Sequence, residues 1–240
     1  MRQPAALGTA TWPEVETRKD AVADLTLLVP VGAVEQHGPH LPLDTDTRIA
    51  VAIATRAGER TPSNSWVAPE LSYGASGEHE GFAGTISLGH EALHQVLLEY
   101  GRSACRWAGR IVFVNGHGGN VATVAGAVAR LRYEAREVAW YPCVFPDADA
   151  HAGHTETSIL LHLSPGLVHT GRLEAGNVAP MRELLGAMRA GGVAAVSGNG
   201  ILGDPRSASA EHGARLLDGA VDDLVRALTE WTVDDGGRLR

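Results

Sequence analysis

Short apolar runs alternate along this chain with longer segments in which apolar residues recur at helical spacing. The runs at residues 25–32, 111–114 and 138–144 have the length of buried strands. The expected helices are residues 46–60, 91–107, 121–136, 155–163, 181–189 and 208–231. Because strands alternate with helices, the pattern predicts the α/β class, with a mainly parallel sheet and helices on both of its faces.

Two glycine-rich stretches interrupt this alternation, at residues 72–89 and 191–206. The composition on either side of each stretch does not change, so we interpret them as loops over a site and not as linkers between domains. The chain has 240 residues, which is enough for one well-buried core and short for two substantial domains. We therefore expect a single domain over residues 1–240.

Composition and charge narrow the function classes. Apolar residues make up 44% and charged residues 20% of the chain, and the formal net charge is −8, which favours a folded globule and argues against binding to nucleic acid backbones. No run approaches the roughly 18 apolar residues that span a bilayer, and the opening residues lack the apolar core of a signal peptide. We therefore expect a cytoplasmic protein with neither nucleic acid nor membrane as a partner.

Histidines and carboxylates are the metal ligands that this chain offers. Its two cysteines, Cys105 and Cys143, are not in a C-x-x-C arrangement, so we expect neither a disulfide framework nor a thiolate zinc site. The 11 histidines are many for a chain with 5% aromatic residues, and several lie in glycine-rich segments. Packing is the expected role of those in helix-like or peripheral positions, which are His90, His94, His162, His169 and His212.

The candidate site lies in the loops that follow the expected strands, because ligands bind at the carboxyl ends of strands in an open parallel sheet. In the first loop, Glu35 and His37 are two residues apart, which places both side chains on the same side of an extended segment. Asp44 or Asp46 then lies at the start of the next helix, directed back toward the strand ends.

The second and third loops add further ligand candidates. His117 stands among glycines in residues 115–120, and glycines let the backbone approach a ligand closely. In the third loop, His151, His154 and Glu156 lie within six residues and lead into a helix.

Each loop also has a simpler interpretation. Glu35 and His37 can be a surface pair, residues 116–119 can be a phosphate-binding turn, and residues 151–158 can be a solvated loop with a threonine as helix cap. The glycine turn, however, lacks both the G-x-G-x-x-G spacing and the Lys-Ser/Thr of a phosphate-binding loop. Three such loops at successive strand ends favour one shared site.

Several ordered motifs of the chain resemble the creatininase (creatinine amidohydrolase) family, namely residues 35–42, Asp46, residues 115–120 and residues 151–158. One branch of this family, the peptidases that trim the mycofactocin precursor peptide, resembles this chain in further motifs. These are residues 73–79, 82–86, 151–158 and 192–197. The resemblance implies a three-layer α/β/α sandwich, a centre of two divalent metal ions, hydrolysis of amide bonds and a ring-like homo-oligomer.

The resemblance also assigns metal ligands. In the family pattern, Glu35, Asp46 and His117 correspond to the ligands of one ion, and His37 and Asp46 to ligands of the other, so that Asp46 bridges the two. Creatininase itself has a glutamate at the position of Gly119 as a further ligand of the second ion. This chain departs from the family pattern there, and another group must complete the second ion.

Three groups are candidates for the missing ligand. Glu156 is the nearest by motif, and His154 or a water molecule are the alternatives. Nitrogen and oxygen ligands without thiolate suit Zn, Fe(II) or Mn(II). Three carboxylates beside two divalent ions leave one net positive charge, which is neutralised when a bridging water loses its proton, so a metal-bridging hydroxide is favoured at neutral pH.

Catalytic and substrate-binding roles follow from the same resemblance. His151 is the counterpart of an active-site histidine and is expected to donate a proton to the leaving amine, because imidazole titrates near the operating pH. Glu156 is the second catalytic candidate. Substrate contacts are expected from Gly118, Gly119, Asn120, Glu78 and His79.

The expected function is therefore that of a two-metal amidohydrolase that cleaves the modified C-terminal part of the mycofactocin precursor peptide. A creatininase-like hydrolase of a small cyclic amide or formamide is one alternative. A protein without catalytic activity, which binds an anion or nucleotide at the glycine-rich strand ends, is another. Metal content separates these classes, since a two-metal hydrolase loses its ions and its activity together on chelation.

Overall fold

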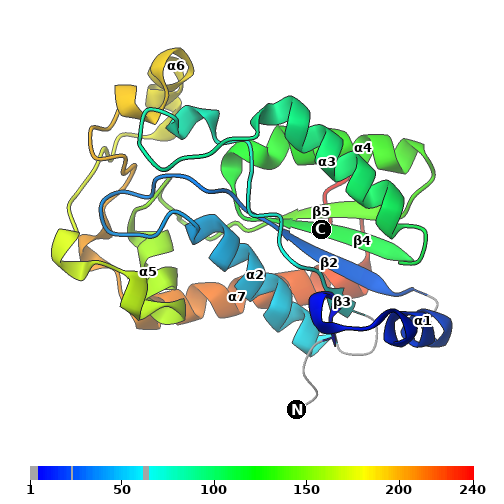
Figure 1. Cartoon of the computed structure of the whole chain (residues 1–240). Coiled ribbons are helices and arrows are strands. Elements are labelled where there is room, and N and C mark those ends of the chain that lie inside the picture. Colours follow the sequence, from blue (N-terminus) through cyan, green and yellow to red (C-terminus); the bar gives the residue numbers. More distant parts are fainter. Residues whose placement is uncertain (1–4, 23, 62–64) are drawn as a thin grey trace.

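A parallel sheet forms the centre of the computed structural model, which describes residues 5–22, 24–61 and 65–240 (Figure 1). Its strands lie in the order β1-β3-β2-β4-β5. They are β1 (Ala5–Ala6), β2 (Thr26–Val31), β3 (Ser65–Val67), β4 (Arg110–Asn115) and β5 (Val138–Pro142). The central pair, β2 and β4, is in register from Thr26 opposite Arg110 to Val31 opposite Asn115.

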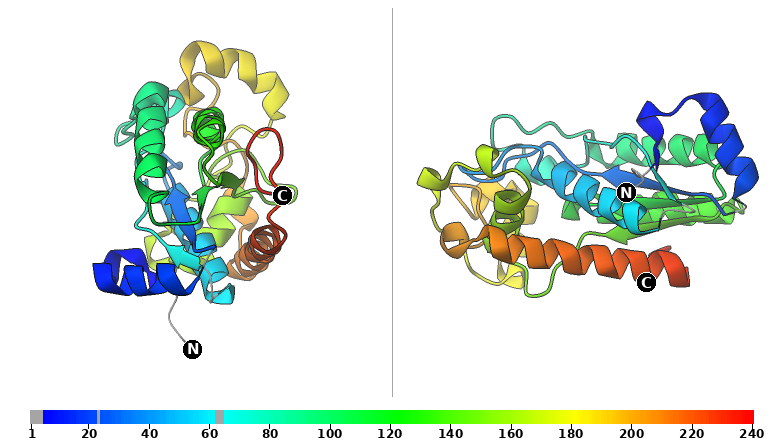
Figure 2. Two further views of the ribbon diagram at one scale, coloured as in Figure 1. Left: turned by 90° about the vertical axis from the view of Figure 1, so that its right-hand side faces the viewer. Right: turned by 90° about the horizontal axis from the view of Figure 1, so that it is seen from below.

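Helices cover both faces of this sheet, as Figures 1 and 2 show. They are α1 (Trp12–Ala21), α2 (Thr45–Arg60), α3 (Gly89–Ala104), α4 (Val121–Tyr133), α5 (His154–Leu163), α6 (Met181–Gly191) and α7 (Ala210–Glu230). α2, α5 and α7 pack on one face, and α3 and α4 pack on the other. The predicted α/β class and its three layers are confirmed. No helix in the described ranges is long and apolar enough to cross a membrane.

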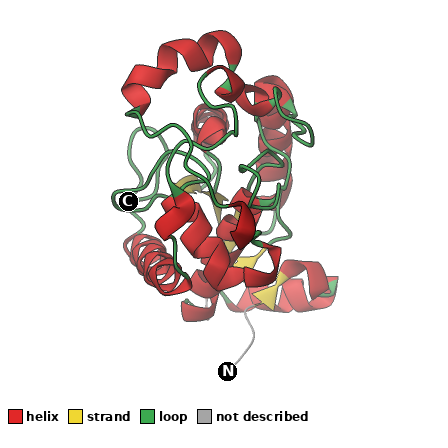
Figure 3. Ribbon diagram, turned by 90° about the vertical axis from the view of Figure 1, so that its left-hand side faces the viewer, coloured by secondary structure: helices red, strands yellow, loops and turns green. Residues whose placement is uncertain are grey.

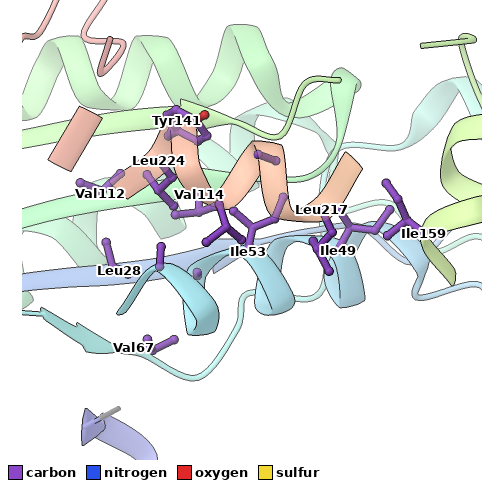
Figure 4. Close-up of a cluster of buried hydrophobic side chains, with 14 of the residues drawn as sticks. Leu28, Ile49, Ile53, Val67, Val112, Val114, Tyr141, Ile159, Leu217 and Leu224 are labelled. Carbon is purple, nitrogen blue, oxygen red and sulfur yellow. The ribbon is translucent and has the colours of Figure 1, made fainter. Parts of the chain in front are cut away.

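The sheet is apolar on both faces because it lies between two helical layers. Alternate residues of β4 show this, since Val114 is buried in the core with α2 and α7, and Phe113 is buried in the core with α3 and α4. Figure 4 shows the first of these cores, where Ile53 of α2 and Leu224 of α7 lie close to the strands. Each uninterrupted apolar run of the sequence therefore places alternate side chains in the two cores.

Most expected elements are present, with ends shifted by a few residues. The expected helix at 208–231 is α7, and the expected helix at 121–136 is α4. The sequence pattern does not predict α1, β1 or β3. A signal for α1 does exist, because Thr11 and Glu14 form a capping box in which the Thr11 backbone N–H donates to Glu14 Oε2 at 2.6 Å. β1 and β3 have two and three residues and are too short to show a period.

The chain reverses its direction across the sheet at β2. From β2, α2 leads to β3 on one side, and from β3, α3 leads back to β4 on the other side. The carboxyl ends of β2 and β4 therefore meet at a topological switch point, where open parallel sheets bind ligands. Figure 3 looks onto this end of the molecule, where many of the loops gather.

The side chain of Asn120 connects three of these loops. Its Nδ2 donates to the Gly32 carbonyl at 3.0 Å and to Asn115 Oδ1 at 3.2 Å, and its Oδ1 accepts from the Ala75 backbone N–H at 2.8 Å. The residue is fully buried. The expectation that Asn120 contacts substrate is therefore corrected, because every polar atom of its side chain is used to join the loops after β2, β3 and β4.

Asn120→Asp is expected to destabilise the fold by about 2–4 kcal/mol, because the carboxylate cannot donate to the Gly32 carbonyl and is buried as a charge. Chemical denaturation measures this free energy of unfolding. The matched control is Gln95→Glu on the exposed face of α3, which is expected to change it by less than about 0.5 kcal/mol. An equally small effect for Asn120→Asp would contradict the joining role.

Candidate metal centre

Four buried side chains from three separate segments meet at the switch point. Glu35 and His37 follow β2, Asp46 lies in the first turn of α2, and His117 follows β4. None of the four is more than 5% exposed. Gly116 permits this approach, because a Cβ at that position would collide with the Asp46 carbonyl oxygen. The structure thus brings together residues that are up to 82 positions apart.

His117 forms a first group with two carboxylates. Its Nδ1 lies 3.2 Å from Glu35 Oε2 and 3.2 Å from Asp46 Oδ2. Both of these oxygens are buried and have no hydrogen-bond partner among the described residues. Buried carboxylate oxygens without partners are costly, and they indicate a cation that completes them.

His37 forms a second group on the other side of Asp46. Its Nε2 lies 3.2 Å from Asp46 Oδ1 and 3.9 Å from Glu156 Oε2. Asp46 therefore directs one carboxylate oxygen at each group, as a bridging ligand does. The five expected ligands fall into two adjacent groups that could hold a metal ion: Glu35, Asp46 and His117 form one, and His37 and Glu156 form the other together with His151.

The donor geometry fits metal ions. Bonds of about 2.0–2.1 Å to a tetrahedral ion place its ligand atoms about 3.4 Å apart, close to the separations in both groups. The imidazoles are also oriented as in metal sites, because His117 Nε2 donates to the Ala75 carbonyl at 3.2 Å and His37 Nδ1 to the Glu35 carbonyl at 3.1 Å. The opposite ring nitrogen of each is thereby directed at the carboxylates.

The buried carboxylates of the cluster favour positive charge on the groups beside them. Burial alone would lower the pKa of His37, but the carboxylates of Asp46, Glu156 and Glu35 outweigh it and raise this pKa to about 10. The pKa of His117 is likewise raised by Glu35 and Asp46 against the effect of burial. These protons balance the buried carboxylates in the metal-free protein, and metal ions would displace them.

Glu156, and not His154, lies at the cluster. Its Oε2 accepts from the Ala152 backbone N–H at 2.6 Å and faces His37. Burial raises the pKa of the Glu156 carboxyl to about 7, and Asp46 adds to this effect against the opposing charge of His37. His154 instead contacts Ser207 Oγ at 3.0 Å and packs against the ring of His212.

His151 lies in the cluster but without a free proton for a leaving group. Its Nε2 donates to the Gln36 carbonyl at 2.8 Å, and its Nδ1 lies 3.7 Å from Glu35 Oε1. Burial, together with the charges of His37 and His79, lowers the pKa of His151 well below its ordinary value. The role of His151 as proton donor to the leaving amine stays a prediction, and in this structure its Nε2 proton is held by the Gln36 carbonyl.

The short 3₁₀ helix η2 (Gly77–His79) adds Glu78 and His79 to the site. Glu78 Oε1 lies 3.4 Å from His117 Nε2, and His79 Nε2 lies 3.3 Å from Glu35 Oε1. A Cβ at Gly119 would lie 2.5 Å from Glu78 Oε1 and would collide with the His117 ring. Glu78 thus occupies the space that a side chain at position 119 would need.

The sequence does not predict two features of the site. Gln36 is buried between the two ligand candidates of its own segment, and its side chain reaches the loops at residues 79 and 200. Helix α6 lines the cavity with apolar residues. The sequence does place Gln36 between Glu35 and His37, and it does predict a helix at 181–189, but neither pattern shows that these residues reach the site. Asp44 is not part of the site, since it pairs with Arg48 at 2.7 Å.

The cluster opens into a cavity of about 400 Å³ with one acidic and one apolar wall. Glu35, Asp46, Glu78 and Glu156 line it on one side, opposite Met181, Leu185 and Met188 of α6. Four carboxylates repel an anion or a nucleotide phosphate and attract cations. The alternative of an anion-binding protein therefore conflicts with the charge of this cavity.

The chain is similar to known proteins over nearly its whole length. A family model described as creatinine amidohydrolase (creatininase) matches residues 8–228. A mycofactocin precursor peptide peptidase of Mycolicibacterium smegmatis is 55% identical over 240 residues, covering 98% of this chain and 95% of that protein. A creatinine amidohydrolase of Pseudomonas putida is 29% identical over 262 residues, covering 96% of this chain and 98% of that protein.

Solved structures show the same architecture. A structure described as "Creatininase Mn" has a TM-score of 0.80 at 28% identity and covers 95% of this chain and 98% of that chain. A mutant creatininase of Zn-Zn type has a TM-score of 0.81 at the same identity and coverage. The family predicted from the residues at three strand ends is confirmed by these matches, and the chain belongs to the creatininase family.

Proposed function

We propose that the chain is a peptidase that holds two divalent ions and cleaves the modified C-terminal part of a mycofactocin precursor peptide. The observation that carries the proposal is Asp46, whose two oxygens face two separate groups of ligands. We assign Glu35, Asp46 and His117 to the first ion, and His37, Asp46 and Glu156 to the second.

Relatives support the substrate and the metals. Proteins from Mycolicibacterium smegmatis and Mycobacterium ulcerans, 55% and 53% identical to this chain, are named for cleavage of that peptide. Creatininases described with Mn or Zn support these two metals. Fe(II) is a third candidate, because nitrogen and oxygen ligands suit it equally.

The shape of the site suits a peptide because two further cavities adjoin the cavity at the cluster. It shares Glu78 and Met188 with a neighbouring cavity of about 540 Å³, and Met181 and Leu202 with another of about 710 Å³. Helix α6 borders all three. A peptide can therefore extend on both sides of a bond held at the cluster, which a small cyclic amide does not require.

The bound ions and the residues around them have separate roles in the proposed hydrolysis. When bound, the ions supply a water that loses its proton near neutral pH and polarise the amide carbonyl. We assign to Glu156 the transfer of a proton from water to the leaving nitrogen, because its carboxylate lies at the cavity wall beside His37, within reach of a water held at the cluster. Gly118 keeps the wall of the cavity open, since nothing lies within 4 Å of where its Cβ would be.

Asp46→Asn is expected to lose both ions and to reduce peptide cleavage at least 100-fold, because a bridging carboxylate serves both groups. Metal content is measured in protein purified without chelator, and release of the C-terminal fragment is followed by mass spectrometry. The wild type is expected to hold about two ions. Asp44→Asn, which changes an exposed carboxylate two residues away, is the matched control and keeps both ions and activity.

Retention of both ions and full turnover by Asp46→Asn would show that Asp46 is no bridge. Wild-type protein with a single ion or none would reject the two-ion centre. A fully loaded wild type that leaves the modified peptide intact would reject the substrate.

Glu156→Gln is expected to empty only the second site, because an amide is neutral and a poorer ligand for these cations. Elemental analysis should fall from about two ions to about one, with His117 and its partners retaining the first. His154→Gln is the control and keeps two ions, since that ring contacts Ser207 and His212. Loss of an ion in the control, and not in Glu156→Gln, would reverse the assignment.

We also propose a homo-oligomer, because apolar side chains on the segment between β3 and α3 are exposed in the single chain. Tyr73 is 47% and Ile86 is 52% exposed. Light scattering should give a particle mass that is a multiple of 25.2 kDa. We expect Ile86→Asp to lower this mass. Tyr133→Asp, at the far end of α4, is the control and should leave it unchanged. A particle of one chain only would overturn this proposal.

A further inference from the structure

Four histidines line the site, and each has one ring nitrogen held by a neighbouring polar group. For His37, His117 and His151 the holding group is a backbone carbonyl, at 3.1, 3.2 and 2.8 Å. A carbonyl only accepts hydrogen bonds, so the held nitrogen of each ring carries a proton. In the neutral ring, the opposite nitrogen is then a lone-pair donor that can ligate a metal ion.

His79 differs because it is held by the side chain of Gln36. The orientation of that amide is settled by the backbone, since Oε1 accepts from the Gly38 N–H and Nε2 donates to the Gly200 carbonyl, both at 2.9 Å. Rotation of the amide would place donor against donor and acceptor against acceptor. The remaining N–H of Gln36 points to His79 Nδ1 at 2.9 Å.

The competing partner for that N–H is excluded. Gln36 Nε2 also lies 3.1 Å from His151 Nε2. That nitrogen is 2.8 Å from the Gln36 carbonyl oxygen, a distance that requires a proton on it. His151 Nε2 is therefore a donor and cannot accept from Gln36, which leaves His79 Nδ1 as the acceptor.

The proton of His79 is consequently on Nε2, the nitrogen that faces the site. This atom lies 3.3 Å from Glu35 Oε1 on the wall of the cavity. Within the described part of the chain, no aligned hydrogen bond occupies it. Glu35, His79 and His151 are close enough to suggest a third metal site, but a protonated Nε2 is not a metal ligand.

We propose that Gln36 is a positioning residue that holds His79 as a neutral imidazole with its N–H directed into the cavity, and that His79 donates this hydrogen bond to the carbonyl oxygen of the scissile amide. A neutral imidazole that polarises a carbonyl strengthens its hydrogen bond as negative charge develops on the oxygen. The proton stays on His79 throughout, so no transfer step is required of it. This inference rests on the proposed amide hydrolysis and gives His79 its part in it.

Nitrogen-15 NMR of the imidazole rings in the zinc-loaded protein reads the tautomer directly, with His79→Phe used to identify the signal. We expect a protonated Nε2 and an unprotonated Nδ1 at neutral pH. A protonated Nδ1, or the signal of a metal-bound Nε2, would overturn the inference. Since no substrate is needed, this result stands even where the peptide is not cleaved, so failure of the proposed function remains distinguishable.

Kinetics test the donor role. His79→Phe should lower kcat about 10²–10³-fold with both ions retained, and His79→Gln, whose amide supplies an N–H, should recover at least tenfold of that loss. Gln36→Glu places a carboxylate opposite Nδ1 and should move the proton there, with a similar loss of kcat and a changed NMR signal. His94→Phe is the control with unchanged kcat. Unchanged kcat or a lost ion in His79→Phe, or no recovery by His79→Gln, would overturn the donor role.

Discussion

Buried negative charge at the junction of β2 and β4 is the constraint on which the site depends. Glu35 and Asp46 have carboxylate oxygens that are buried without a hydrogen-bond partner among the described residues, and such charge is tolerated only beside positive charge. In the metal-free protein the imidazoles of His37 and His117 supply that charge as protons. The same arrangement favours two metal ions, because Asp46 presents one oxygen to each imidazole.

Backbone groups around the cluster determine which atoms it presents. Three carbonyls hold three imidazoles so that the opposite ring nitrogen of each, which can ligate a metal ion once it is unprotonated, is directed inward, and one amide side chain holds a fourth with its N–H directed inward. These holding groups belong to loops that Asn120 joins through its own hydrogen bonds. The chemistry of each histidine therefore follows from its partner, although all four side chains are the same.

The two walls of the cavity rest on different parts of the fold. The acidic wall is attached to strands and helices of the two large cores. The opposite wall, α6, packs on a small separate cluster around Leu184, Val193 and Leu202, and its contacts are with short 3₁₀ turns. A region with few buried apolar contacts opens at lower free energy than the core, which suits the wall that an extended substrate has to pass.

The sequence by itself determined the class of the fold and most of the ligands. Continuous apolar runs followed by helical periods require a parallel sheet between helices, and this topology places the residues after β2 and β4 at one edge. Glu35, His37 and His117 could therefore be predicted from position alone, and Asp46 could be predicted together with Asp44. The motif order added the family, which the comparisons confirm.

Only the tertiary structure decided between residues of the same type. Asp46 and Asp44 are both near the start of α2, but the helix turns the first into the cluster and leaves the second paired with Arg48. His154 and Glu156 begin the same helix, yet only Glu156 faces His37. His151 and His79 carry their protons on the nitrogens that Gln36 selects through its carbonyl and its amide. These differences depend on hydrogen bonds between residues that are far apart in the chain. Such bonds produce no periodicity or regular spacing in the sequence.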